Sequence, residues 1–557
     1  MQGLATLGQT CPTQPLARRL VATSLEVPMS HAAPRSQLGT HEVFNQPDPL
    51  LRDPWADDIA LRSIVGEDPE LAALGAALGA QSTRDAARDA QTRLPELRTF
   101  DRSGRRIDEV HFHPGYHQLM TLGLEAGYAA TAWDGTGSHL RHSAINYMLS
   151  QVEPGVCCPM TMTYAAVPAM AADPDLAALW QPKLTARAYD PSRRAVGQKE
   201  AATLGMAMTE KQGGSDVRAN STRAVPDGEG YRLFGHKWFC SAPMCDGFLT
   251  LAQTDAGVTC FLVPRWLPDD TRNPFTILRL KDKLGNKANA SSEIEYDGTY
   301  AQRLGEDGRG VQTIIEMVHH TRLDTAMAPA GLMRAALGEA MHWARGRTTF
   351  QRKLIDQPLM RSVLADLALE AESALLLALD IARAFDDPAR RPYARLSVAL
   401  AKFLSNKRAP GMVYECMECL GGMGYVEETP LPMLYREAPL NSIWEGSGNV
   451  ICLDILRTLA REPEAGVQLN AQLDAARGLD NRFDQALNAH RSRWPALPPE
   501  AEARWFAESL ATLLAGAVML AESPVAGAYL ATRLGETRGT IAGAMGAFDV
   551  ENVLERV

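Results

Sequence analysis

Residues 205–217 read GMAMTEKQGGSDV and lie where a helical part of the chain gives way to short strands. Gly213 and Gly214 let backbone N–H groups come close to a ligand, and Thr209 and Ser215 add hydroxyl groups. A Gly-rich loop by itself indicates a binding site only weakly, so a plain turn between strands is the alternative interpretation. The change of pattern across this stretch decides the fold class that we predict.

The two sides of this stretch differ in periodicity. From about 58 to 190 the chain is rich in Ala and Leu at helical spacing. After about 200, short β-type runs alternate with Gly, Asp and Pro, as expected of a compact antiparallel sheet. These runs are 231–240, 247–254, 258–264 and 291–296.

Long helices return after about residue 310. Residues 331–347, 362–385 and 396–422 are each long enough to be helices of a bundle. A further helix is expected from about Asn449, with Asn449 or Ser447 as its N-cap. More helical sequence follows it to the end of the chain.

The predicted fold is therefore α+β and mainly helical. We expect a loose N-terminal extension, a helical domain, a central antiparallel β domain, a helical bundle domain and a C-terminal helical extension. Their predicted limits are 1–40, 41–198, 199–305, 306–462 and 463–557.

Composition narrows the class of protein. The 557 residues are 46% hydrophobic and 22% charged, as in a globular protein, and the net charge of −10 argues against a globally basic nucleic-acid binder. No apolar run approaches the roughly 18 residues of a membrane span, and the N-terminus has no apolar signal region, so we expect a cytoplasmic protein. The nine cysteines fit a reducing compartment. We interpret the lone CxxC of Cys416 and Cys419 as core residues and expect no metal.

Three further stretches combine residue types that suit a cofactor. In GHKWFCSA, residues 235–242, Trp238 would face a flat aromatic ligand or else fill a core. In RGRTTF, residues 345–350, Arg347 would bind phosphate or else stabilise a helix C-terminus. In CLGGMGY, residues 419–425, the glycines would offer N–H groups to a pyrophosphate or else end a helix.

A single carboxylate, Glu445, stands in NSIWEGSGN, residues 441–449, between apolar residues and a Gly-Ser-Gly turn. Ile443 and Trp444 beside it would exclude water and so raise its pKa. Abstraction of a proton beside a thioester carbonyl requires such a base. The alternative is an acid that only caps the following helix.

In chain order, the motifs MTEKQGGSD, RTTF, CLGGMGY and IWEGSGN resemble those of the acyl-CoA dehydrogenase family over about residues 60–460. VFNQPDPL, GRRIDEVHFHP and CPMTMTYAA, with the helical tail, are similar to the AidB-like branch of that family. This branch contains adaptive-response flavoproteins associated with DNA alkylation damage. The resemblance implies the acyl-CoA dehydrogenase fold with a four-helix bundle, bound FAD and a homotetramer.

The resemblance also implies roles for individual residues. Glu445 matches the catalytic base, and Arg322 would face the CoA side of an acyl-CoA substrate. Trp238 would lie against the isoalloxazine ring, while the segment around Arg347 would reach FAD bound mainly by a neighbouring subunit. The residues expected at FAD are Met206, Met208, Thr209, Ser215, Trp238, Phe239, Cys240, Ser241, Arg347, Thr349, Phe350, Gly421, Gly422, Trp444, Ser447 and Asn449.

Several positions depart from the family pattern. Cys240 stands where many members have a Thr facing flavin N5, and a thiol is a weak hydrogen-bond donor. Lys211 replaces the usual Pro, Glu418 replaces the Gln before the glycine pair, and Gln351-Arg352-Lys353 replaces Gly-x-Pro. These changes leave FAD binding expected and efficient acyl-CoA turnover open.

Two classes of function compete. One is an acyl-CoA dehydrogenase in which Glu445 removes the α-proton while a β-hydride passes to FAD. The other, which the sequence favours, is an AidB-like flavoprotein of the DNA alkylation response that binds double-stranded DNA and has weak or vestigial dehydrogenase activity. A flavin oxidase of nitroalkanes ranks last, because a Glu rather than an Asp stands at the base position.

If the chain binds DNA, we expect the positively charged contact residues to lie in the tail. Residues 450–557 contain ten Arg, no Lys and fourteen acidic residues, so composition supplies no excess of positive charge. The resemblance suggests Arg457 and Arg538 as DNA contacts, and Arg461 and Arg533 would converge with them in a tetramer. Solvated helix faces or intersubunit salt bridges are the alternative.

Overall fold

The computed structural model describes residues 42–535, 538–546 and 548–557. The predicted loose extension, 1–40, lies outside these residues. The chain divides into two units, Met1–Gln46 and Pro47–Val557. Residues 42–46 of the first unit contain no helix or strand, and the fold below is that of the second unit alone.

The second unit begins with helices whose first turns are fixed by acidic caps. The side chains of Asp58, Asp68 and Asp173 accept hydrogen bonds from backbone N–H groups of the turns that follow them. The helices are α1 (Ile59–Val65), α2 (Pro69–Gly79), α3 (Gln81–Thr92), α4 (Pro114–Glu125), α5 (His139–Ser150), α6 (Cys157–Met170) and α7 (Pro174–Leu184).

A hairpin of β1 (Glu96–Phe100) and β2 (Arg106–His111) interrupts this helical part. The sequence of this region was expected to be helical, so this hairpin was not predicted. Every second residue of β1 is exposed and the others are only half-buried, so the strand buries one face lightly and leaves a weak hydrophobic signal.

The central β domain has the predicted strands and three more. The predicted runs become β5 (Gly230–Cys240), β6 (Gly247–Thr254), β7 (Gly257–Pro264) and β9 (Ser292–Leu304), which confirms them. The additional strands are β3 (Leu204–Ala207), β4 (Arg223–Asp227) and β8 (Phe275–Leu280). Most neighbours are antiparallel, but β3 and β4 each pair with β6 in parallel, so the wholly antiparallel prediction is wrong there. Because β6 also pairs with β7, the strands β4, β5, β9, β7 and β6 close into a ring.

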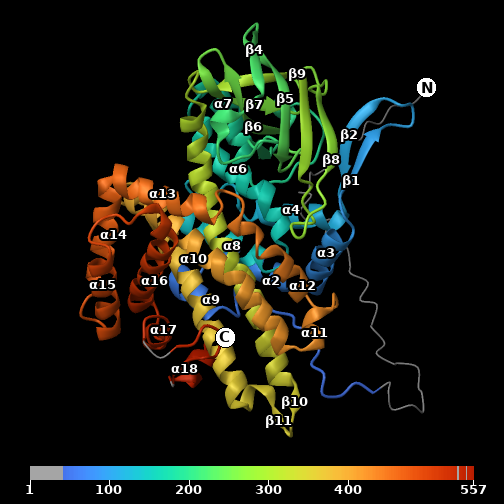
Figure 1. Ribbon diagram of the computed structural model, residues 1–557. Helices are drawn as coiled ribbons and strands as arrows, with labels where there is room; N and C mark the ends of the chain where they lie inside the picture. The colour runs from blue at the N-terminus through green and yellow to red at the C-terminus, as the bar shows by residue number, and fades with distance from the viewer. Residues whose placement is uncertain (1–41, 536–537, 547) are drawn as a thin grey trace, which may run out of the picture. The chain divides into compact units, whose positions relative to one another are not determined.

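Long helices follow the sheet, as predicted. The bundle consists of α8 (Gly310–Gly346), α9 (Pro358–Phe385), α10 (Arg391–Cys419) and α13 (Gly448–Arg461), with the short helices α11 (Gly422–Tyr425) and α12 (Leu431–Glu437) before the last. Figure 1 shows α8 running from the β domain alongside α9 and α10 to the small hairpin of β10 (Thr348–Thr349) and β11 (Arg352–Lys353). The element order fits the predicted α+β class, mainly helical.

Five helices form the tail: α14 (Pro463–Ala475), α15 (Asn481–Arg493), α16 (Ala503–Glu522), α17 (Ala526–Arg533) and α18 (Val550–Leu554). Among the described residues, one helical stretch, Glu500–Glu522, is long and apolar enough by composition to cross a membrane. Two thirds of its apolar window (67%) is buried inside the fold, where α16 packs on α9 and α10. These contacts are those of a core helix.

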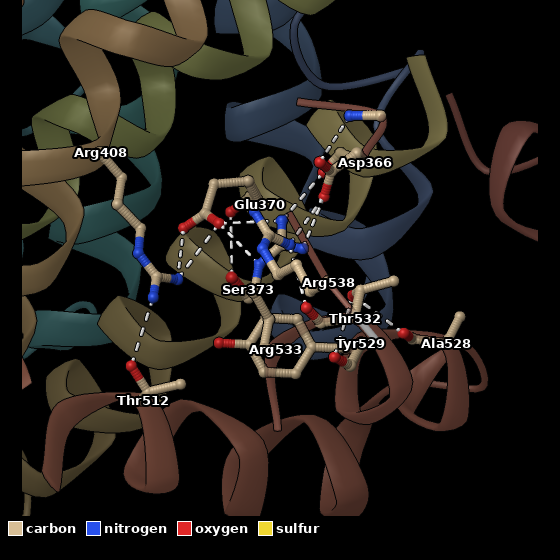
Figure 2. A network of polar contacts seen from close by, with 11 residues as sticks. Asp366, Glu370, Ser373, Arg408, Thr512, Ala528, Tyr529, Thr532, Arg533 and Arg538 are labelled. Atoms are coloured by element: carbon tan, nitrogen blue, oxygen red, sulfur yellow. Dashed lines mark hydrogen bonds and ion pairs between the residues drawn. The ribbon is translucent and has the colours of Figure 1, made fainter. Parts of the chain in front are cut away.

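A buried ionic network fastens the tail to the bundle (Figure 2). Arg533 of α17, with a side chain only 4% exposed, pairs with Asp366 at 2.5 Å and Glu370 at 3.0 Å, both on α9. Arg408 of α10 pairs with Glu370 at 3.0 Å. Burial opposes ionisation of Glu370, but Arg408 and Arg533 outweigh it and hold its pKa at about 2. Arg538 joins more weakly, 3.4 Å from Asp366.

Replacement of Arg533 tests this network. Arg533→Met is expected to lower the free energy of unfolding by about 3–5 kcal/mol, because it removes the buried cation that pairs with both Asp366 and Glu370. The matched control Arg538→Met, whose side chain is 28% exposed, should cost less than about 1 kcal/mol. Denaturant unfolding followed by circular dichroism measures both, and equal losses would contradict the assignment.

The effect of Arg533→Met should also depend on pH. The pKa of Glu370 is lowered in the fold from an ordinary 4.5 to about 2. Its stabilising contribution is therefore complete above about pH 4.5 and is lost as the pH falls toward 2. The difference between the variant and the parent protein should shrink over that range.

Candidate active site

Glu445 lies in a strained turn between a 3-10 helix, Leu440–Ser442, and α13. Its φ is 57° and that of Gly446 is 106°, so a non-glycine residue adopts the left-handed conformation here. The ammonium of Lys402, on α10, donates to the carbonyl oxygens of Asn441 at 3.0 Å and Gly446 at 2.8 Å. The two bonds hold the turn on both sides of Glu445.

The Glu445 carboxyl group belongs to a half-buried residue and is hydrogen-bonded to the protein. Its Oε2 accepts a hydrogen bond of 2.7 Å from the Thr321 hydroxyl, and its backbone carbonyl accepts one of 3.2 Å from Arg322 Nε. Burial raises the pKa of Glu445, and Thr321, Lys402 and Arg322 only partly oppose it. The expected raised pKa is confirmed, although Ile443 is 63% exposed and so contributes little to the burial. The carboxyl group is thus suited to accept a proton.

A cavity opens beside this carboxyl group. The cavity itself is small, about 40 Å³, and its walls come from α5, α6, α8, the turn before α13 and the end of β5. Thr321, Trp444 and Glu445 line it from the helical side, and Ser241 lines it from the β domain. A ligand in the cavity would therefore touch the base and the β-domain edge together.

The predicted cofactor residues of the β domain are brought together at that edge. The Trp238 N–H donates to the Thr209 carbonyl at 2.8 Å, and the Ser241 N–H donates to the Met206 carbonyl at 3.3 Å. These bonds tie the 205–217 stretch to the end of β5. Trp238 is half-buried and presents a flat ring.

Four more predicted residues lie along this edge and differ in exposure. Phe239 is 44% exposed and Ser215 is exposed, whereas Met208 is half-buried. Cys240 is fully buried, and burial raises the pKa of its thiol. The thiol therefore stays protonated near neutral pH.

A buried ion pair fixes the Gly-rich loop. Glu210, inside the quoted stretch, accepts from Lys237 Nζ at 2.9 Å, and neither side chain is exposed. The same carboxylate accepts from the backbone N–H groups of Ser221 and Thr222. The loop that carries Thr209 and its neighbours is therefore rigidly placed against the sheet.

A second group of predicted residues lies elsewhere in the same chain. Arg347 follows Thr321 by 26 positions along α8, which corresponds to about 39 Å at 1.5 Å per residue. Figure 1 shows the β10–β11 hairpin, which contains Thr349, and α11 at that end of the bundle. Phe350, at the hairpin turn, is 92% exposed.

The glycine pair at this end is open to a ligand. Gly421 has a φ of 61°, and no neighbouring atom lies within 4 Å of where a Cβ would stand at Gly421 or Gly422. This second group cannot contact the same bound molecule as Glu445 within one chain.

The start of α13 differs from the prediction. Ser447 occupies the N-cap position, but its side chain makes no capping hydrogen bond. The Asn449 side-chain oxygen instead accepts from Arg504 of α16 at 2.9 Å. Ser447 and Asn449 are not among the residues that line the cavity.

Arg322 is committed to the protein itself. It is buried and pairs at 2.6 Å with Asp454 of α13, which also pairs with Arg395 at 2.9 Å. With its bond to the Glu445 carbonyl, these contacts show Arg322 bracing the turn. A contact with the CoA side of a substrate stays a prediction.

The arginines predicted for DNA fall into two classes. Arg533 is buried in the tail network and Arg538 donates into it, so the expected convergence is wrong for Arg533. Arg457 and Arg461 are exposed on α13, and neither has a carboxylate partner in the described part of the chain. This second pair is open to another molecule, and a DNA contact of Arg538, which is also exposed, stays a prediction.

Sequence reasoning missed two residues that hold Glu445 and its turn. Thr321 directly precedes the predicted Arg322, but a Thr inside a helix carries no distinctive signal. Lys402 stands between Ala401 and Phe403 in an apolar part of a helix, where a lone charge was a signal that could have been read.

Family comparisons cover most of the chain. Residues 38–191 match the adaptive response protein AidB N-terminal domain, residues 205–299 the acyl-CoA dehydrogenase middle domain, and residues 308–460 the acyl-CoA dehydrogenase C-terminal domain.

Individual relatives agree with this division. The chain is 42% identical over 520 residues to the putative acyl-CoA dehydrogenase AidB of Escherichia coli (strain K12), which covers 90% of this chain and 96% of that protein. It is 32% identical over 476 residues to acyl-CoA dehydrogenase family member 11 of Caenorhabditis elegans, covering 80% and 76%.

Two solved structures share the fold. Bd2924 in its apo form has a TM-score of 0.79 at 30% identity, covering 86% of this chain and 99% of that one. Caenorhabditis elegans ACDH-11, solved in complex with C11-CoA, has a TM-score of 0.79 at 27% identity, covering 94% and 93%.

The raised pKa of Glu445 predicts a pH-dependent cost in stability. A carboxyl group whose pKa is higher in the fold stabilises the fold when protonated, and this contribution is lost as the pH rises through the folded pKa. Glu445→Gln removes that dependence, so its melting temperature should exceed that of the parent at pH 8, with the gap closing toward pH 4.5. The exposed Glu428→Gln is the control. A gap of the same size at every pH would disprove this account.

Proposed function

The chain belongs to the acyl-CoA dehydrogenase family, in its AidB-like branch, and from this membership we propose that it is an FAD-dependent oxidoreductase acting on the CH–CH bond of an acyl thioester. One observation carries the proposal. Glu445 from the bundle and Ser241 from the β domain line the same cavity, although 204 positions separate them in the sequence. A substrate there would meet a proton acceptor on one side and the cofactor-binding edge on the other.

The residues at this edge fit FAD. Trp238 offers a half-buried flat surface. Gly213 has a positive φ, a backbone conformation that a residue with a side chain would adopt only with strain. Ser241 and Thr209 add polar groups suited to a flavin ring edge. When bound, FAD would supply a two-electron acceptor beside the cavity.

Glu445 would take the proton from the carbon next to the thioester carbonyl. Its carboxyl group is desolvated, which strengthens it as a base, and the Thr321 hydroxyl fixes its direction. The N–H groups of Glu445 and Gly446 donate to no acceptor in the described residues. They are therefore available to the thioester carbonyl, and donation there would acidify the α-carbon.

The separation of the two residue groups supports a shared cofactor. The β-domain edge and the end of α8 lie too far apart to serve one FAD within a chain, whereas both groups are of FAD-binding type. A homotetramer, in which the Phe350 hairpin of one copy meets the β-domain edge of another, would bring them together.

Anaerobic mixing with a panel of acyl-CoA thioesters tests the proposed activity. We expect at least one thioester to reduce the bound flavin, seen as bleaching of its visible absorbance, and Glu445→Gln to slow this step by a factor of 10² or more, as for loss of a general base. Glu428→Gln should react like the parent. A flavin that stays oxidised with every thioester, in a protein that holds FAD, would reject this function.

DNA association is the second candidate, and the exposed arginines favour it. Arg457 and Arg461 project from α13 without carboxylate partners in the described residues. Phosphate contacts by such side chains would bind DNA without reading its sequence. A role in the DNA alkylation response is supported only by similarity to the AidB branch.

Salt-dependent binding of a DNA duplex tests this second candidate. Arg457→Ala is expected to weaken binding equally for unrelated sequences and to reduce the slope of log K against log salt by about 1. Arg533→Met is not a suitable comparison because it is expected to destabilise the fold, so the exposed Arg493→Ala serves as control. An unchanged slope would remove Arg457 from any DNA surface.

A further inference from the structure

Lys402 is a buried lysine whose ammonium bonds only to backbone. The residue is 2% exposed, on the face of α10 that meets the turn before α13. Its Nζ donates to the carbonyl oxygens of Asn441 and Gly446, at 3.0 and 2.8 Å. No carboxylate forms a salt bridge with it in the described residues. A buried ammonium without a direct salt bridge is costly, so its retention needs a reason.

We propose that Lys402 is a positioning residue for Glu445: by joining the two ends of the turn, it holds the base in its left-handed conformation and keeps a positive charge beside the carboxylate. The inference rests on the proposed function to the extent that Glu445 is the base. The role of Lys402 in holding the turn does not depend on whether Glu445 is the base.

The geometry shows why the turn needs a clamp. The left-handed region is sparsely populated by residues with a side chain, and Glu445 occupies it with a φ of 57°. Asn441 and Gly446 stand on either side of this residue, so one ammonium that binds both carbonyls fixes the span between them. Arg322 binds the Glu445 carbonyl within that span. Two cations from two helices therefore hold the backbone that aims the carboxyl group.

The charges around the base make its ionisation depend on Lys402. Lys402 from α10 and Arg322 from α8 both favour the charged form of Glu445, against burial. From α6, the Cys158 thiol also faces it. Lys402 in turn faces Glu445, Arg322 and Lys407, and burial lowers its pKa to about 7. Loss of the Lys402 charge would raise the pKa of Glu445 further.

A melting-temperature cycle tests the clamp without any activity. Glu445→Gln and Glu445→Gly both remove the charge, but only Gly relieves the left-handed strain. The Gly variant should therefore melt at a clearly higher temperature than the Gln variant when Lys402 is present. This difference in melting temperature should shrink in Lys402→Met, because the released turn no longer imposes the left-handed conformation on residue 445. Lys407→Met is the matched control: Lys407 is exposed on the same helix and donates to the Ser442 hydroxyl instead of to the two carbonyls. A difference that survives in Lys402→Met would overturn the clamp.

The pH profile of α-proton exchange tests the charge. With an acyl-CoA that the parent protein deuterates in D₂O, the rate should rise with pH as Glu445 ionises. In Lys402→Met the midpoint should move up by about one pH unit or more, whereas Lys402→Arg should keep the midpoint and lower only the rate. A uniform loss at every pH, without a shift of the midpoint, would overturn the electrostatic role. If the parent exchanges no acyl-CoA, the proposed function fails, while the melting-temperature cycle still decides the clamp.

Discussion

Everything at the candidate site depends on keeping one carboxylate away from water without losing it as a base. Burial alone would leave Glu445 protonated and inert. A hydroxyl and a guanidinium from α8 and an ammonium from α10 lower the pKa of Glu445, but they only partly offset the increase caused by burial. Each of these groups also bonds to the turn or the carboxyl group itself. The same contacts therefore set both the position and the proton affinity of Glu445.

Helix α8 connects the Glu445 site to the hairpin that carries part of the second group of predicted residues. Near its start, Thr321 and Arg322 hold the base, and beyond its last residue, Gly346, the chain turns through Phe350 into a short hairpin. Because a continuous helix fixes the distance between these points, the two groups of cofactor-type residues cannot fold back onto each other. The residues that we propose to bind FAD are therefore divided between distant surfaces. Such a division has a functional meaning only if copies of the chain associate.

Much of the fold follows from sequence pattern, and the exceptions have physical causes. Strands β5, β6, β7 and β9 were predictable because each contains β-branched or aromatic residues and is bounded by turn residues. The parallel pairing of β3 with β6 was not, since pairing direction depends on contacts between distant segments. At the site, Glu445 was predictable from its neighbours in the sequence. The lone charge of Lys402 in an apolar helix marked it as unusual, but its two carbonyl partners could not be predicted because they depend on the packing of α10 against the turn.

The tail is best understood through the helices that it supports. Its arginine Arg533 is used inside the fold, and the carboxylate Glu370 that it neutralises also binds Arg408 of α10. Arg408 lies six positions after Lys402 on the same helix. The network in Figure 2 therefore ties α10 to α9 and to the tail. On α16, Arg504 also reaches the side chain of Asn449 at the start of α13. The tail thus braces α10, whose Lys402 holds the Glu445 turn, and the start of α13, which follows that turn. Any surface function of the exposed arginines must accommodate this structural role.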